Sequence, residues 1–505
     1  MSKILHGGRL SSVREDVAKF TSSRKDDERL ATAVVDINKA HVIMLIEQKI
    51  IRQQDGAKIL KALANQSNVK LDPSAEDVHM AVEEAVLKET GPDVGGNLHI
   101  AKSRNDQVTT AIRMELRKEL INLMLKTLEM QASLLDTAGT HINTVILEYT
   151  HLQAAQPVTF GHYLLSYFQG LQRDFERLLD AYDRVNLCPL GAGALATTSF
   201  PINRKRTAEL LSFNSVLENS IDAVGSRDFI LETQAALTLL AVNLSRLAED
   251  LIIWSSQEFG TVELPDDFTS TSSIMPQKKN PEVLEVIRAH ASYALGDFVA
   301  STAAVKSLPS TYNLDFQEVT PKLWATIDNL SQSLSIFTQL IPNLKVSPDV
   351  ESKAAAGFVG ATELANMLVR KYDVAFRTSH KIVGALVKVL VDSHQTLLDA
   401  TPELLQKVAQ EAVGVKLTVK KEDIVECTNP RKLIETYKVQ GGPSAVEVEK
   451  SIVTSKKTME EAKTAIVTLK NNLANAQKKL QLTLESYTSK SAENTKLKNS
   501  NTQVE

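Results

Sequence analysis

The sequence predicts an all-α protein built around a bundle of long helices. Strand signals are scarce: few apolar runs alternate with polar residues, and the one Asp-Gly pair, Asp55-Gly56, lies between helix-like segments. Apolar residues instead recur at alternating steps of four and three, which places them on one stripe of a helix. Long helices with such stripes usually bury them against each other, often between subunits.

Three stretches carry the clearest stripes. The first helix is expected to begin near Asp106, and the last to cover about residues 227–258. Both exceed the mean globular helix of about 11–12 residues. The apolar positions are Val108, Ile112, Leu116 and Leu120 in the first stretch, Leu164, Phe168, Leu171, Phe175, Leu178, Tyr182 and Val185 in the second, and Phe229, Leu237, Leu240, Leu244, Leu247 and Leu251 in the third.

A chain of 505 residues is too long for one ordinary core, so several domains are expected. A turn-rich break at residues 91–97 and a second break around residues 342–356 divide the chain. We therefore predict an N-terminal helical domain (1–101), a central long-helix domain with a catalytic loop (102–353) and a C-terminal helical domain (354–505).

The end of the chain has two parts. Apolar residues follow heptad spacing from Ile452 to Leu480, which predicts another long helix. From about Thr488 to Glu505 the residues are polar, and they predict a disordered tail.

Composition narrows the class of protein. Lys and Arg (57) nearly balance Asp and Glu (61), for a net charge of -4, which argues against a general binder of nucleic acid or anionic membranes. The two cysteines, Cys188 and Cys427, are too few for a disulfide framework or a cysteine-built zinc site. With no long apolar run and no secretory leader at the start, a cytoplasmic protein without a membrane span is expected.

The first chemically dense segment is Ser103-Arg104-Asn105-Asp106-Gln107. A serine, an arginine and an amide just before a helix form a good receptor for a carboxylate, because the arginine fork and the helix N-terminus both favour an anion. Taken alone, the segment is better explained as an N-cap beside a surface arginine.

The second segment runs from Thr150 to Pro157 and contains His151. A histidine in a polar loop before a proline-started helix can act as general acid or base, since its pKa lies near neutrality. The competing interpretation is an exposed or capping histidine. His162, the next histidine along the chain, is not at zinc-ligand spacing, so no metal site is expected.

The third segment, residues 269–285, is a loop of serines, threonines, prolines and paired lysines between two helices, and it can close over a ligand. Lys278 and Asn280 have the chemistry to stabilise an anion, and Glu285 can orient a histidine. A solvated connector is the alternative.

These segments resemble a known family. Ser272-Ser273-Ile274-Met275-Pro276-Gln277-Lys278-Lys279-Asn280-Pro281 resembles the signature loop of the fumarase/aspartase superfamily, whose members eliminate fumarate from a succinyl group. Ser103–Val108, Tyr149–Pro157 and Pro309–Glu318 resemble argininosuccinate lyases in particular. Several segments in the right order are more specific than one motif.

The resemblance implies an elimination without metal or cofactor, in which argininosuccinate yields arginine and fumarate for arginine biosynthesis. It makes Ser272 the base and His151 the group that protonates the departing nitrogen, although these two roles can be exchanged. Glu285 pairs with His151, while Lys278 and Asn280 stabilise the aci-carboxylate. The residues expected to bind the succinyl carboxylates are Ser103, Arg104, Asn105 and Thr150, and those expected to bind the arginine half are Ser23, Asp27, Tyr312 and Gln317.

The family also implies a homotetramer with a twenty-helix core, three domains per chain, and active sites assembled from three subunits. Two departures from the family stand out. Thr271 replaces a glycine of many relatives, and Val319-Thr320 replaces an acid and a lysine, so that Lys322 is the nearest substitute for that lysine. Two alternative functions are adenylosuccinate lyase and a crystallin-like structural protein without activity.

Overall fold

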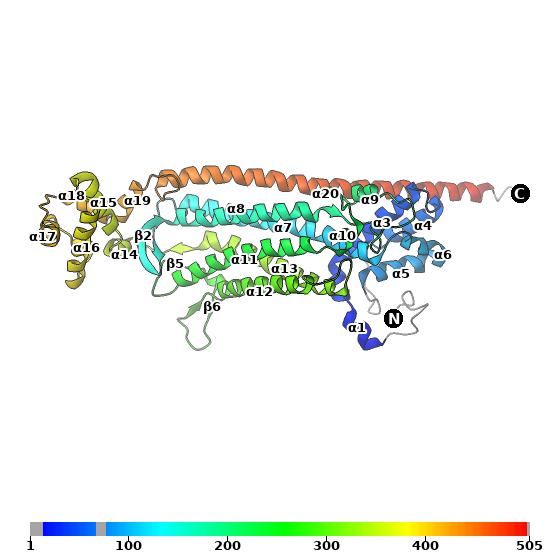
Figure 1. Ribbon diagram of the computed structural model, residues 1–505, viewed down its shortest axis with the longest axis horizontal. Helices are drawn as coiled ribbons and strands as arrows, with labels where there is room; N and C mark the ends of the chain where they lie inside the picture. Colours follow the sequence, from blue (N-terminus) through cyan, green and yellow to red (C-terminus); the bar gives the residue numbers. More distant parts are fainter. Residues whose placement is uncertain (1–13, 67–76, 502–505) are drawn as a thin grey trace.

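The computed structural model describes residues 14–66 and 77–501, so the first residues of the chain lie outside it. The molecule is elongated (Figure 1). Short helices form one end, a small helical body forms the other, and a bundle of long helices joins them. The predicted all-α class is therefore confirmed, and the strands are few and short.

The N-terminal end consists of short helices with one longer central helix, α3. Its elements are α1 (Glu15–Thr21), α2 (Arg24–Asp27), η1 (Glu28–Leu30), α3 (Ala31–Glu47), α4 (Gln53–Ala64), α5 (Val78–Thr90), α6 (Pro92–Gly95) and η2 (Gly96–His99).

Five long helices form the bundle: α7 (Arg104–Thr140), α8 (Phe160–Val185), α11 (Asp228–Trp254), α12 (Glu282–Val305) and α13 (Thr320–Leu340). The predicted stripe of α8 is confirmed, because all seven of its residues are buried. The helix expected near Asp106 begins at Arg104, since Ser103 acts as its N-cap. The helix expected over residues 227–258 ends earlier, at Trp254.

Short elements connect these helices. They are β3 (Leu187–Cys188), α9 (Arg204–Leu210), β4 (Ser215–Val216), α10 (Ser220–Gly225), β5 (Val262–Glu263), η3 (Asp266–Phe268), β6 (Ser270–Thr271), β7 (Lys279–Asn280), η4 (Leu314–Glu318), η5 (Ile341–Asn343) and β8 (Lys345–Val346). β3 pairs with β4 in parallel, whereas β5 with β8 and β6 with β7 pair antiparallel.

The loop expected around His151 is instead a β-hairpin of β1 (Val145–Thr150) and β2 (Gln153–Thr159). The prediction that Pro157 starts a helix is wrong: Pro157 lies in β2 opposite Leu147, and α8 begins at Phe160. A two-stranded hairpin leaves one edge of each strand unpaired, so a proline can occupy a strand without breaking a ladder.

The small body at the opposite end has its own hydrophobic core, which includes Leu364, Leu386, Leu405 and Ile424. Its elements are α14 (Val350–Ala356), α15 (Ala361–Tyr372), α16 (Phe376–Asp392), η6 (Leu397–Asp399), α17 (Pro402–Val413), α18 (Lys421–Thr428) and α19 (Pro430–Thr436).

The last helix, α20 (Ala445–Asn501), leaves this body and runs back along the bundle to the N-terminal end (Figure 1). Met459, Ile466 and Leu480 on its predicted stripe join the core of the bundle. The compact part of the predicted third domain therefore ends before α20. The helix also includes most of the stretch expected to be a disordered tail, which contains neither glycine nor proline to stop it.

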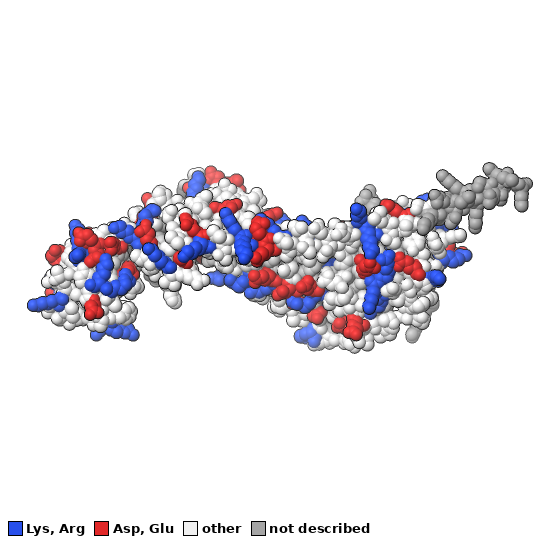
Figure 2. Space-filling view, turned by 90° about the horizontal axis from the view of Figure 1, so that it is seen from above, with Lys and Arg blue, Asp and Glu red and all other residues white. Residues whose placement is uncertain are grey.

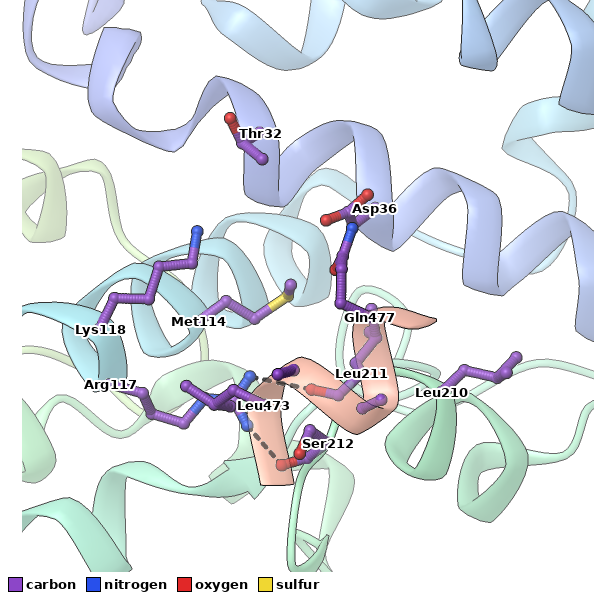
Figure 3. A pocket seen from close by; sticks show the side chains of 12 residues that line it. Thr32, Asp36, Met114, Arg117, Lys118, Leu210, Leu211, Ser212, Leu473 and Gln477 are labelled. Atoms are coloured by element: carbon purple, nitrogen blue, oxygen red, sulfur yellow. Dashed lines mark hydrogen bonds between the residues drawn. The ribbon is translucent and has the colours of Figure 1, made fainter. Parts of the chain in front are cut away.

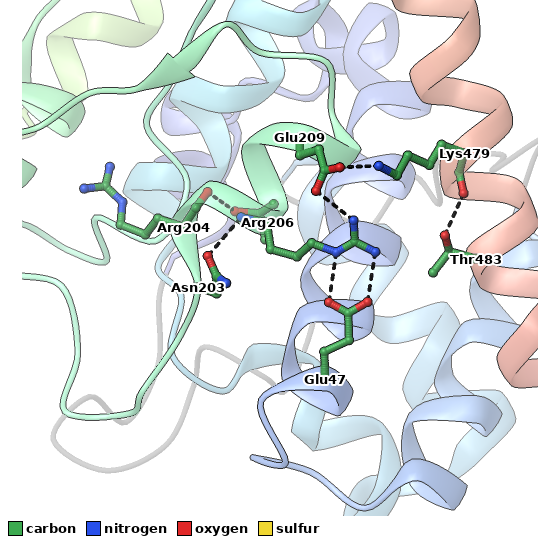
Figure 4. Close-up of polar contacts among 8 residues, drawn as sticks. Glu47, Asn203, Arg204, Arg206, Glu209, Lys479 and Thr483 are labelled. Atoms are coloured by element: carbon green, nitrogen blue, oxygen red, sulfur yellow. Dashed lines mark hydrogen bonds and ion pairs between the residues drawn. The ribbon is translucent and has the colours of Figure 1, made fainter.

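Polar contacts hold α20 to the N-terminal end (Figure 4). Lys479 of α20 forms an ion pair with Glu209 of α9. Arg206 forms two further ion pairs, with Glu209 at 2.8 Å and with Glu47 of α3 at 2.9 Å. Beside this network, α3, α7 and α20 enclose a cavity of about 340 Å³ (Figure 3). Arg117 donates to the Leu211 and Ser212 carbonyls at its edge, at 2.9 and 2.7 Å.

Charges are mixed over the surface. In Figure 2 acidic and basic side chains alternate along the face in view, without a field of one sign. Within residues 14–66 and 77–501, no helix combines the length and apolarity needed to cross a membrane.

Candidate active site

The start of α7 is a tightly bonded corner. The Ser103 hydroxyl accepts the Asn105 N–H, and the Ser103 N–H donates to Asp106 at 3.0 Å. Asp106 is fully buried and also accepts the N–H groups of Gly191 and Gly193, each at 2.9 Å. Burial raises the pKa of Asp106 to about 6. The interpretation as an N-cap is therefore correct for Ser103, and it leaves Arg104 free to point elsewhere.

Sequence reasoning did not assign Asp106 a role. The signal in the sequence was the pair of glycines, Gly191 and Gly193, in the loop that Asp106 holds. Their φ angles are +85° and +64°, a conformation that favours glycine. Asn105 reaches the same loop, donating from Nδ2 to the Ala194 carbonyl at 3.1 Å. The loop of residues 189–195 is thus tied to the helix start that carries Arg104.

A narrow cavity opens beside Arg104, and we call it the N-terminal cavity. Five residues predicted to bind substrate line it together: Ser23, Asp27, Arg104, Tyr312 and Gln317. They come from α2, α7 and the region of η4, which are far apart in sequence. The structure therefore brings the predicted arginine-half residues together with the arginine of the α7 corner.

Electrostatic coupling runs through this cavity. The Ser23 hydroxyl donates to Asp27 at 2.6 Å, and Arg104 forms an ion pair with Asp77. Burial raises the pKa of Asp27 to about 6, and the nearby Asp77 carboxylate adds to that rise. A cavity with several carboxylates and guanidinium groups can bind a ligand that carries both charges.

Three charged residues of the lining were missed by the sequence analysis: Asp26, Asp77 and Arg227. Thr320 also lines the cavity, at the position where the family resemblance implied a lysine. Lys322 does not replace that lysine within the chain: it is absent from the lining and its Nζ lies 3.9 Å from Asp297.

His151 lies at the tip of the β1–β2 hairpin, and its side chain is exposed, as is that of Thr150. His151 and Leu152 both have φ of +56°, so the tip is a tight turn with left-handed backbone at two non-glycine residues. His151 borders a shallow hollow together with Glu148 and Asp250. Burial raises the pKa of Glu148 to about 7.

The signature loop projects from the bundle between β6 and β7. The Ser272 hydroxyl accepts the Ile274 and Met275 N–H groups at 3.3 and 3.1 Å, which folds the loop into a local turn. Ile274 is 82% exposed. An apolar tip in this position has no covering partner within the described chain.

The two lysines of the loop differ. Lys279 pairs with Asp266 at 2.7 Å and Glu263 at 3.2 Å, whereas Lys278 has no side-chain partner among the described residues. Asn280 approaches Ser270 at 3.5 Å. Lys278 is therefore the lysine that is available to a ligand.

Glu285 lies exposed in the first turn of α12 and makes no contact with His151 within the described part of the chain. The hairpin with His151 and the N-terminal cavity lie at opposite ends of the bundle (Figure 1). A single chain thus unites the predicted arginine-half residues, but it keeps His151, Ser272 and Glu285 away from them.

Comparisons with known proteins agree with this fold. A family model described as Lyase matches residues 14–296. The EDDS lyase crystal structure with formate superposes with a TM-score of 0.88 at 30% identity, covering 92% of this chain and 93% of that one. A class II fumarase from Schistosoma mansoni superposes with a TM-score of 0.68 at 16% identity, covering 80% of this chain and 90% of that one, so it shares the fold. The helical bundle and its signature loop thus define a lyase of the fumarase/aspartase superfamily.

Closer relatives narrow the class. A family model described as Argininosuccinate lyase C-terminal matches residues 358–435. The argininosuccinate lyase of Methanocaldococcus jannaschii is 44% identical over 89% of this chain and 93% of its own length. The argininosuccinate lyase of Methanosarcina barkeri is 41% identical over 96% of this chain and 99% of its own length. The chain belongs to the argininosuccinate lyase family.

Proposed function

We propose that the protein catalyses the reversible elimination of argininosuccinate to arginine and fumarate, in the cytoplasm and as a step of arginine biosynthesis. The observation that carries the proposal is the N-terminal cavity, where Ser23, Asp27, Arg104, Tyr312 and Gln317 meet. Polar groups placed to bind one amino acid leave unpaired donors and acceptors with another, so such a cavity supports specificity for the arginine half.

We also propose that the protein is a homotetramer whose active sites are shared among subunits. Apolar side chains on the outer faces of α11 and α12 support this, because Leu239 is 45%, Tyr293 61% and Val299 57% exposed. A single chain gains nothing by exposing such a row, whereas an interface would bury it. Five long helices from each of four chains would form the twenty-helix core.

In such a tetramer, the exposed hairpin and signature loop of other subunits would complete the site at the α7 corner. Ser103, Arg104, Asn105 and Thr150 would hold the succinyl carboxylates. Charge that builds on one carboxylate as the proton leaves would be stabilised by Lys278 and Asn280.

Two residues would then move protons. Ser272 would take the Cβ proton and His151 would protonate the guanidinium nitrogen as its bond to carbon breaks, or the two would exchange these steps. Glu285 of a second subunit would pair with His151 and select its tautomer. No step requires an added group.

The deciding experiment is fumarate release by the purified protein, measured with argininosuccinate, adenylosuccinate and EDDS in parallel. We expect release from argininosuccinate alone and its loss in Ser272→Ala. Release from adenylosuccinate or EDDS instead would contradict the assigned specificity. A folded protein inactive with all three would favour a crystallin-like structural role.

A further inference from the structure

Arg227 is a buried cation at the N-terminal cavity. It is 1% exposed, precedes α11 directly, and lines the cavity beside Tyr312 and Gln317. Its guanidinium carbon lies 4.2 Å from the centre of the Phe316 ring. Stacking on that ring holds the plane of the guanidinium in place, which fixes the directions of its N–H groups.

The hydrogen bonds of Arg227 are incomplete. Nη1 donates to the Val224 and Ser226 carbonyls at 3.1 and 2.7 Å. Nε and Nη2 are buried and have no partner among the described residues, and no carboxylate there forms an ion pair with Arg227. Burying two guanidinium N–H donors without acceptors costs folding free energy. We therefore expect an acceptor from outside the chain to bind this edge of Arg227.

The other deeply buried arginines differ. Arg113 and Arg117 leave only Nε as a buried atom without a partner, and both donate from Nη atoms to main-chain carbonyls. Neither lines the N-terminal cavity. Arg227 therefore has two donors without a partner in the described chain, Nε and Nη2, on one edge of its guanidinium, and it lines the cavity. Two donors on one edge can bind a carboxylate in a bidentate manner.

The charges around the cavity indicate which carboxylate this is. Arg104 is already paired with Asp77, and it lies at the α7 corner where the succinyl group is proposed to bind. Arg227 lines the cavity with Tyr312 and Gln317, which are proposed for the arginine half, and it stacks on Phe316, the neighbour of Gln317 in sequence. Lys322 is turned toward Asp297, so Arg227 is the cation among the lining residues that is not paired with a carboxylate of the described residues.

We propose that Arg227 binds the α-carboxylate of the arginine half and thereby determines the specificity for an α-amino acid. The inference rests on the proposed function, and it assigns to Arg227 the charge that Thr320 cannot supply. Asp27, which carries the opposite charge, would bind the cationic groups of the arginine half.

The test uses the reaction in the direction of bond formation. A guanidinium nitrogen adds to one carbon of fumarate and a proton to the other, so no further reactant is needed. Fumarate is supplied with either arginine or arginine amide, in which a neutral carboxamide replaces the α-carboxylate. We expect Arg227→Met to lower the ratio of kcat/KM for arginine over that for arginine amide by about 10- to 100-fold.

Two further variants separate binding from folding. Arg113→Met removes an equally buried arginine that stacks on Phe229 at 3.8 Å, and it should leave the ratio at the wild-type value. Arg227→Lys retains the charge if the methionine variant does not fold, and it should reduce the ratio less. The melting temperature of each variant is measured alongside.

The outcomes are distinct. If Arg227→Met or Arg227→Lys lowers the rates with both substrates equally, Arg227 supports only the fold and the inference is overturned. If the wild-type protein neither joins arginine to fumarate nor releases fumarate from argininosuccinate, the proposed function itself fails.

Discussion

The two ends of the bundle differ in how deeply they bury the residues proposed for the active site. At the N-terminal cavity, side chains from distant segments meet within one chain, and several are half-buried and paired with each other. At the other end, His151 lies on an exposed hairpin tip and Ser272 on a projecting loop. The groups proposed to recognise the amino acid thus lie together within one chain, whereas the groups proposed for proton transfer face outward.

Because the two ends differ in burial, mutations can separate the two proposed functions. Changes at the cavity should act on KM, on specificity and on stability, because its residues are packed into the fold. Changes at the hairpin tip or the loop should act on kcat with little effect on the fold, because exposed groups contribute little to stability.

The largest effect is expected at the hairpin. His151→Asn should lower kcat by roughly 100- to 10,000-fold, since it removes a proton-transferring group, while the melting temperature stays within about 1 °C. Steady-state kinetics and calorimetry measure the two. A variant with near-normal kcat would remove His151 from the mechanism.

Mixing tests whether His151 and Ser272 reach one active site from different chains. His151→Asn and Ser272→Ala are each expected to be inactive, but subunits exchanged between them should include some sites that lack neither residue. Activity should therefore return after mild dissociation and reassembly of a mixture. Absence of recovery in verified mixed oligomers would show that both residues act from the same chain.

The apolar rows of α11 and α12 provide the next test. Tyr293→Asp would bury a charge in the proposed tetramer core and should dissociate the protein, with activity lost in parallel. Light scattering after gel filtration reports the mass. Val391→Asp, at a residue of α16 that is 50% exposed, is the matched control and should leave the oligomer unchanged.

A smaller, pH-dependent effect is expected in the cavity. Burial raises the pKa of Asp27 from 3.8 to about 6, so the folded state holds this proton more tightly than the unfolded state. The cost of ionising Asp27 therefore appears as the pH rises from about 4 through 6. Asp27→Asn should stabilise the protein at pH 7.5 by about 1–2 kcal/mol, and this gain should vanish below about pH 4.

The same substitution should impair binding. Asp27 is ionised above about pH 6, so the wild-type KM for argininosuccinate should rise as the pH falls below that value. In Asp27→Asn the KM should be higher at neutral pH and lose this dependence. Equal pH profiles for the two proteins would show that Asp27 does not contact a cationic group of the substrate.

The smallest effect concerns the attachment of α20 at the N-terminal end of the molecule. Lys479 and Glu209 are each about half exposed, at 49% and 50%. Lys479→Ala should therefore destabilise the protein by less than about 1 kcal/mol and leave kcat unchanged. A larger loss in chemical denaturation would mean that the network around Arg206 stabilises the cavity more than exposed pairs usually do.

Sequence patterns carried much of the fold because a helix buries one face. The spacing of Leu164, Phe168 and Leu171 specifies which face of α8 is apolar, and the structure buries that face. The hairpin at His151 was missed because its strands are short and Pro157 suggested a helix start. α20 was recognised by its heptads as far as Leu480, but not its course along the bundle.

By itself, the sequence determined the helical class, the apolar stripes and the candidate residues, because periodicity and local motifs depend on neighbours along the chain. Helix packing places Ser23, Arg104 and Tyr312 around one cavity, and it puts Arg227, with two unpaired donors, in the lining of the same cavity. It also decided that His151 faces outward at the opposite end of the bundle. Distances between remote residues follow from how the helices pack, and helix packing depends on side chains from the whole chain at once.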